Sequence, residues 1–252
     1  MCQDCGCSLN GPAQRLSPLH RAETQTLPLL QSLHLQNQAV ADEIRQQLAQ
    51  HRVLAVNLMS SPGAGKTALL EASLARLARD FRCAVLEGDL ETDLDAQRIR
   101  AQGVPALQIT TGNACHLDAR MVKDALARMD LANLDIVFIE NVGNLVCPAS
   151  FDLGQHANVI LLSVTEGDDK PAKYPVMFRA ADLVLISKID LLPHLGDFDP
   201  ARAETFLRRL ASQAPVMALS ARKGEGLDAW FGWLREQRQQ VHATPAVAAQ
   251  GA

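Results

Sequence analysis

The 252-residue sequence lacks the features that would point to a membrane or to a nucleic acid. It has no run of Lys and Arg, and its formal net charge is -4, so attraction to nucleic acid or to an anionic membrane is not expected. No stretch approaches the roughly 18 consecutive apolar residues of a membrane span. The basic start and apolar run of a signal peptide are also missing, so we expect a cytoplasmic protein.

Apolar runs alternate with amphipathic stretches through most of the chain. This pattern predicts an α/β fold with a mostly parallel sheet and helices on both faces. The predicted strands cover 53–60, 83–89, 106–110, 135–140, 158–165, 182–187 and 215–220. The predicted helices cover 65–80, 93–102, 117–129, 201–212 and 227–240, and a further helix, with Leu33, Val40, Ile44 and Leu48 near helical spacing, leads into the domain.

Both ends of the chain differ in composition from the middle. Residues 1–30 are polar, contain several prolines and show little periodicity, which predicts a flexible N-terminal tail. Residues 31–240 form the expected P-loop domain. Residues 241–252 are expected to be a disordered C-terminal tail.

The segment "SSPGAGKT" lies where the first strand becomes a helix. It matches the phosphate-loop pattern G-x-x-x-x-G-K-[ST] except that Ser60 replaces the first glycine. Inward-turned backbone N–H groups and the helix N-terminus favour phosphate binding. Lys66 is expected to reach the β- and γ-phosphates, and Thr67 to ligate Mg²⁺. The predicted phosphate contacts are Gly63, Ala64, Gly65, Lys66 and Thr67.

The segment "DLVLISKID" resembles the guanine-reading end of a GTPase strand. Asp190 would accept two hydrogen bonds that guanine offers and adenine does not, while Lys188 would pack over the base. Ser187 replaces the usual asparagine. One unit later, Ser220 and Ala221 match the small loop that closes over guanine, so the pattern favours GTP over ATP.

Acidic residues end two of the predicted strands. Glu87 and Asp89 end one, and Glu140 ends another, so all three face the nucleotide crevice of a parallel sheet. We expect Asp89 and Glu140 to ligate Mg²⁺. Asp93 and Asp95 are weaker candidates for positioning the attacking water, and Asp93 has the alternative reading of a helix cap. The predicted catalytic residues are Lys66, Asp89 and Glu140.

The six cysteines fall into groups. In a reducing compartment, clustered cysteines favour metal binding or redox chemistry over structural disulfides. Cys115, His116 and Cys147 form a set that suits Zn²⁺ or Ni²⁺, and water or a second copy of the chain would complete it. Cys83 lies inside an apolar strand and is expected to be a small buried side chain.

Several segments together resemble the HypB family of hydrogenase maturation GTPases. They are "SSPGAGKT", "EGDLETDLDAQRI", "TGNACHLDA", "FIENVGNLVCPASFDLG", "SVTEGDDKPAKYP" and "SKIDLL". The resemblance implies a GTPase that forms a homodimer promoted by GTP or metal. It implies nickel delivery to the large subunit of [NiFe]-hydrogenase together with a HypA-type nickel chaperone. By the same resemblance, Cys115, His116 and Cys147 become metal ligands.

The opening "CQDCGC" resembles the tail that some members of this family carry as a tight nickel site. Cys2, Cys5 and Cys7 would supply three thiolates and a terminal amine a fourth ligand. That set fits square-planar Ni²⁺, whereas Zn²⁺ favours a tetrahedron. No histidine-rich run follows, since only His20 and His34 precede the domain, so bulk nickel storage is not expected.

Three other functions remain open from the sequence. One is a GTPase accessory protein for another nickel enzyme such as urease. Another is a P-loop small-molecule kinase, in which Asp89 would act as base toward a hydroxyl group. The third is a metal-storage protein in which GTP is only structural.

Overall fold

The computed structural model describes residues 23–112 and 114–243, so the expected tail ligands Cys2, Cys5 and Cys7 lie outside the described residues. Within these ranges, seven strands form one sheet in the order β3-β2-β4-β1-β5-β6-β7, and each neighbouring pair is parallel. The strands are β1 Leu54–Ser60, β2 Cys83–Asp89, β3 Ala106–Thr110, β4 Ile136–Glu140, β5 Ala157–Ser163, β6 Leu183–Ser187 and β7 Val216–Ala218. The predicted α/β fold with a mostly parallel sheet is confirmed.

The described helices connect these strands. They are α1 Glu23–His51, α2 Lys66–Leu77, α3 Leu94–Arg100, α4 Ala119–Leu126, α5 Lys170–Lys173, α6 Pro175–Arg179, α7 Pro200–Arg209 and α8 Leu227–Ala243, with short 3-10 turns η1 Leu131–Asn133, η2 Pro148–Ser150 and η3 Ile189–His194. The chain divides into two units after Leu35, and the packing and sites described below belong to the second unit. None of the helices in the described ranges has the length and apolar character of a membrane-spanning segment.

Helix boundaries differ from the prediction in three places. α1 begins at Glu23, so the last part of segment 1–30 is helical although Pro28 argued against a helix there. α8 continues to Ala243, past the expected end at residue 240. The short helices α5 and α6 were not predicted, because each has proline in its first turn and neither is long enough to show a helical period.

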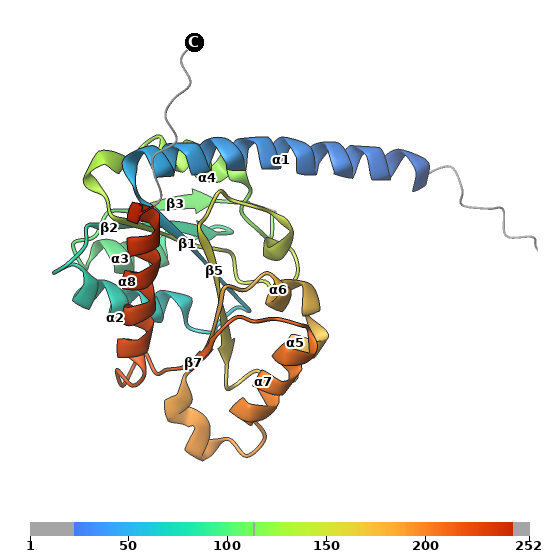
Figure 1. The fold of residues 1–252 in the computed structure, drawn as a ribbon, viewed down its shortest axis with the longest axis vertical. Helices are drawn as coiled ribbons and strands as arrows, with labels where there is room; N and C mark the ends of the chain where they lie inside the picture. Colours follow the sequence, from blue (N-terminus) through green and yellow to red (C-terminus); the bar gives the residue numbers. More distant parts are fainter. Residues whose placement is uncertain (1–22, 113, 244–252) are drawn as a thin grey trace, which may run out of the picture. The chain divides into compact units, whose positions relative to one another are not determined.

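Alternate side chains of the strands build hydrophobic cores on both faces of the sheet. On β1, Leu54, Val56 and Leu58 face a cluster formed with α2, α3 and α8. Ala55 and Met59 point to the opposite face, where two clusters include residues of α1 and α4 and of α6 and α7. Helices therefore cover both faces of the sheet, and Figure 1 shows α2 and α8 on the same side.

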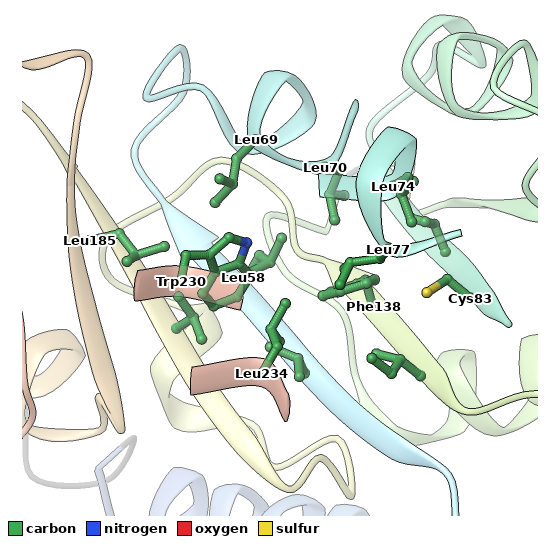
Figure 2. Close-up of a cluster of buried hydrophobic side chains, with 14 of the residues drawn as sticks. Leu58, Leu69, Leu70, Leu74, Leu77, Cys83, Phe138, Leu185, Trp230 and Leu234 are labelled. Carbon is green, nitrogen blue, oxygen red and sulfur yellow. The ribbon is translucent and has the colours of Figure 1, made fainter. Parts of the chain in front are cut away.

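Trp230 of α8 anchors the first of these cores. It is fully buried and lies among Leu58, Leu69 and Leu185 in Figure 2. Its indole Nε1 donates a hydrogen bond of 2.9 Å to the Ser73 hydroxyl of α2, so the polar atom of this large side chain is satisfied. This packing holds α2 against the core. Because α2 directly follows the phosphate loop, the N-terminus of α2 is held in place as well.

The parallel arrangement gathers the polar loops at one edge of the sheet. β1 ends at Ser60 and β4 at Glu140, and these strands are direct neighbours. β2 lies on the other side of β4, with Glu87 paired to Glu140 in register. The predicted phosphate loop and the predicted acidic residues therefore converge on the same crevice, as expected for the carboxyl edge of a parallel sheet.

Candidate nucleotide and metal site

The phosphate loop joins β1 to α2 in a conformation that glycine permits. Gly63 and Gly65 have φ of 75° and 102°, in the left-handed region that side chains disfavour. No side chain caps the N-terminus of α2 and its first turn holds no acidic residue, so its N–H groups and partial positive charge remain available to an anion. Lys66 Nζ lies 3.2 Å from Ser60 Oγ, so the serine that breaks the motif holds the lysine over the loop.

Glu140 lies beside both the lysine and the threonine of this loop. Thr67 Oγ1 donates a hydrogen bond of 2.9 Å to Glu140 Oε1, and Lys66 Nζ is 3.9 Å from the same oxygen. Burial raises the pKa of Glu140, and burial together with the charge of Glu140 raises the pKa of Glu87. Ligand oxygens of Glu87, Asp95 and Glu140 lie within 4.8 Å of one another.

These carboxylates fit a hard divalent cation. Among the residues that the structure describes, Oε2 of Glu87 and Oε2 of Glu140 are buried and have no hydrogen-bond partner. Unpaired buried carboxylate oxygens beside a threonine hydroxyl are the donor set that Mg²⁺ prefers. The crevice around them has a volume of about 430 Å³ and is lined by the phosphate loop and by the ends of β2 and β4.

The acidic residues that flank this set are placed differently from one another. Asp89 lines the same crevice but is not part of the close set, since its oxygens accept hydrogen bonds from Glu91 N at 3.3 Å and Thr92 Oγ1 at 3.0 Å. Asp93 precedes α3 without capping it and pairs instead with Arg100. The structure thus brings Glu87 and Asp95 closest to Glu140, with Asp89 at the rim.

A second cavity of about 330 Å³ lies where the predicted guanine-reading residues meet the phosphate loop. Its lining includes Gly65, Ser187, Lys188, Asp190, Leu219, Ala221 and Arg222. Ser187 Oγ donates to the Ala64 carbonyl at 2.8 Å, and Lys188 Nζ donates to the Gly63 carbonyl at 2.6 Å. These two bonds tie the end of β6 to the phosphate loop, and Gly65 and Ala68 line both cavities.

Ser220 and Ala221 are placed differently with respect to this cavity. Ala221 lines it, whereas Ser220 is fully buried behind it. The Ser220 hydroxyl accepts a hydrogen bond of 3.0 Å from Lys223 N, which shapes the loop that Ala221 and Arg222 belong to. Arg222 was not singled out from the sequence, because an arginine in a polar loop carries no distinguishing pattern.

The sulfur and imidazole groups predicted as a metal site come together. Cys115 Sγ lies 3.0 Å from Cys147 Sγ and 3.8 Å from His116 Nδ1. All three are partly exposed, and both thiols are free. Burial lowers the pKa of His116, which favours the neutral form of the ring that coordinates metals. Phe151 stacks on this ring with centroids 3.9 Å apart. Two thiols and a neutral imidazole fit a borderline cation such as Zn²⁺ or Ni²⁺.

The segment between Glu140 and Cys147 connects this set to the phosphate loop. Asn144 N donates to the Ser60 carbonyl at 2.8 Å, and Asn144 Nδ2 donates to the Cys115 carbonyl at 3.3 Å. Asn144 Oδ1 also accepts from Val146 N at 2.8 Å, one residue before Cys147. One asparagine therefore contacts both the phosphate loop and the segments that carry the two thiols.

Close packing also joins the segment between Glu140 and Cys147 to the phosphate loop. A side-chain carbon on Gly143 would lie 2.8 Å from Pro62 Cα, so the two segments touch through their backbones. On the other ligand segment, Leu117 packs against Gly88 of β2, and Leu117 N donates to Asn141 Oδ1 at 3.2 Å. Sequence reasoning missed these asparagines, because Asn in a loop is typical of any turn.

The fold and the phosphate loop define a P-loop nucleotide-binding protein. Residues 54–218 match the CobW/HypB/UreG family, nucleotide-binding domain. The chain belongs to this family, and within it to the HypB group.

Relatives and solved structures agree with this grouping. Hydrogenase maturation factor HypB of Escherichia coli is 52% identical over 80% of this chain and 69% of that protein. Hydrogenase/urease maturation factor HypB of Helicobacter hepaticus is 43% identical over 90% of this chain and 94% of that protein. The crystal structure of HypB from Helicobacter pylori in complex with nickel matches with a TM-score of 0.78 and 42% identity, covering 81% of this chain and 96% of that one.

Proposed function

We propose that this protein is a GTP-hydrolysing nickel metallochaperone that assists the maturation of [NiFe]-hydrogenase in the cytoplasm. The observation that carries the proposal is the contact of Asn144 with both the phosphate loop and the Cys115 segment. Through this contact, a change at the phosphates alters the geometry of the metal ligands. The relatives named as hydrogenase maturation factors support the same role.

In the proposed reaction, the protein positions GTP for attack by water. Lys66 binds the β- and γ-phosphates, and Asp190 accepts hydrogen bonds from the guanine edge. Thr67, Glu140 and Glu87 would hold Mg²⁺, whereas Asp89, which the sequence predicts as a ligand, lines the same crevice outside this close set. When bound, Mg²⁺ would neutralise charge on the phosphates.

The water-positioning group is best assigned to an acidic side chain in the crevice. Asp95 lies in the close set with Glu87 and Glu140, and so it can reach the space beside the γ-phosphate. Its Oδ1 accepts a hydrogen bond of 2.8 Å from Arg98 Nη1. Slow turnover is expected without a partner, because positioning alone supplies the catalysis.

Nickel is the cargo in this proposal. Cys115, His116 and Cys147 would hold it, with Zn²⁺ as the competing ion. Three ligands leave the coordination incomplete, and a second chain across a two-fold axis would complete it in a GTP-promoted homodimer. The tail cysteines, which lie outside the described residues, would form the separate tight nickel site.

The proposed partners are a HypA-type nickel chaperone and the hydrogenase large subunit. A second acceptor is favoured by one observation, since the Helicobacter hepaticus relative is named as a maturation factor for both hydrogenase and urease. Transfer to immature urease is therefore the alternative to test alongside hydrogenase.

Two measurements test the proposal. The nickel-loaded protein should release phosphate from GTP in preference to ATP, and should transfer nickel to an immature hydrogenase large subunit faster with GTP than without nucleotide. Transfer of the γ-phosphate to a small hydroxyl compound rather than to water would instead support a kinase. Lys66→Ala is the matched control, because it should remove hydrolysis and leave nickel binding at the thiols intact.

A further inference from the structure

We propose that Asn37 is a positioning residue for the sulfur and imidazole site. Its side-chain amide would set the separation between the segment that carries His116 and the segment that carries Cys147. The inference rests on the proposed function, since it takes these side chains to be metal ligands.

Asn37 lies on α1 and bonds to two other segments at once. Its Nδ2 donates to the Asp152 carbonyl at 2.7 Å, and its Oδ1 accepts from Ala119 N at 2.9 Å. Ala119 is the first residue of α4 and is fully buried. Its N–H is one of the donors that a helix N-terminus leaves without an intrahelical partner. Both polar atoms of the Asn37 amide are therefore used, one for each segment.

The bonded residues are close neighbours of the proposed ligands. Ala119 follows His116 by three residues, and Asp152 follows Phe151, whose ring stacks on the His116 imidazole at an interplanar angle of 19°. Cys147 begins the turn that leads to Phe151. The Asn37 amide thus connects two backbone positions. One lies three residues after His116, and the other lies one residue after Phe151, whose ring stacks on His116.

The other α1 contacts lack this bridging character. Gln38 Nε2 donates to the Asp152 carboxylate at 3.2 Å, and Arg45 pairs with the same carboxylate. Glu43 pairs with Lys123 of α4. Each of these reaches one segment only. The Asn37 side chain bonds to both segments, so Gln38 and Glu43 provide matched controls.

The experiment uses full-length protein in which Cys2, Cys5 and Cys7 are replaced by alanine, so that Ni²⁺ can bind only at the domain site. Ni²⁺ titration follows the thiolate-to-nickel absorption band. Asn37→Ala should weaken binding about ten-fold or more and shift the band, because groups that orient metal ligands affect affinity by 10–100-fold. Gln38→Ala and Glu43→Gln should keep both the affinity and the band.

A second variant guards against misfolding. Asn37→Asp keeps an acceptor for the buried Ala119 N–H but loses the donor to Asp152, so it should fold and still shift the band. Parental affinity and an unchanged band in both Asn37 variants would overturn the positioning role and leave the proposed function standing. A parent protein with no thiolate-to-nickel band would overturn the metal site itself, and the positioning role with it.

Discussion

Replacing Gly143 with alanine tests the contact between the phosphate loop and the thiol-bearing segment. The added carbon would lie 2.8 Å from Pro62 Cα and 3.0 Å from Pro62 N, both of them backbone atoms. Carbon atoms pack best at about 3.5–4.0 Å, so one segment must retreat by roughly 0.7 Å. Gly143 does not have positive φ, and the effect is therefore one of space and not of backbone strain.

The size of the effect follows from this displacement. Overpacking of this kind costs about 1–3 kcal/mol, which lowers the melting temperature by about 2–4 °C for each kcal/mol in a domain of this size. A misplacement near 1 Å in a catalytic loop costs up to about 100-fold in rate. We expect Gly143→Ala to lower kcat/KM for GTP by about 10–100-fold if the phosphate loop retreats.

The assay combines GTP turnover, the thiolate-to-nickel absorption band and thermal unfolding. If the 143–147 segment retreats instead of the phosphate loop, the nickel band should shift while turnover changes less. Gly196→Ala is the matched control, because a side-chain carbon there meets nothing within 4 Å. Gly143→Ala protein that equals Gly196→Ala protein in turnover and in the nickel band would refute the proposed contact.

Three further predictions concern the base, the tail and the opposite end of the sheet. Asp190→Asn should weaken GTP binding by at least about 100-fold and improve binding of xanthosine triphosphate, measured by competition; an unchanged preference removes Asp190 from base reading. Deleting residues 1–8 should abolish the tightest nickel site without altering GTP turnover, and undiminished nickel affinity would contradict the tail site. Hydrogen bonds from Arg82, and then from Arg238, hold the pKa of Asp135 well below its usual range. A lowered folded-state pKa stabilises the protein above the unfolded value of about 3.9, and this contribution disappears as the pH falls through the folded value. Asp135→Asn should therefore cost about 1.5–3 kcal/mol at pH 7, and urea unfolding should show the difference shrinking below pH 4; a constant difference would exclude this linkage.

The sequence predicted the sheet well because its strands are buried on both faces. The predicted strand 83–89, for example, begins and ends at the residues where β2 does. The phosphate loop could also be predicted, because its sequence pattern requires Lys66 and Thr67 to follow a glycine turn at the start of a helix. The short helices α5 and α6 escaped prediction because a helical period needs more residues than they have.

The acidic residues of the site were harder to rank from sequence. Asp89 ends β2, and that position favoured it over Glu87. The parallel register instead pairs Glu87 with Glu140, and Asp89 extends beyond the end of β4. Register depends on the pairing of two distant strands, which a single sequence does not reveal.

Contacts made by asparagine could not be predicted at all. Asn37 and Asn144 act through backbone groups of residues more than 25 positions away, and no residue pattern marks such bonds. The sequence predicted Cys115, His116 and Cys147 as one set, whereas only the folded chain shows which contacts hold their segments together.

The most direct test of the account is the Ni²⁺ affinity of the domain site in different nucleotide states. Calorimetry on the full-length protein with its three tail cysteines replaced by alanine would compare GDP, a non-hydrolysable GTP analogue and no nucleotide. The account predicts that affinity for Ni²⁺ differs between the GDP and GTP-analogue states, because both loops meet at Asn144. Equal affinity in all three states would contradict it.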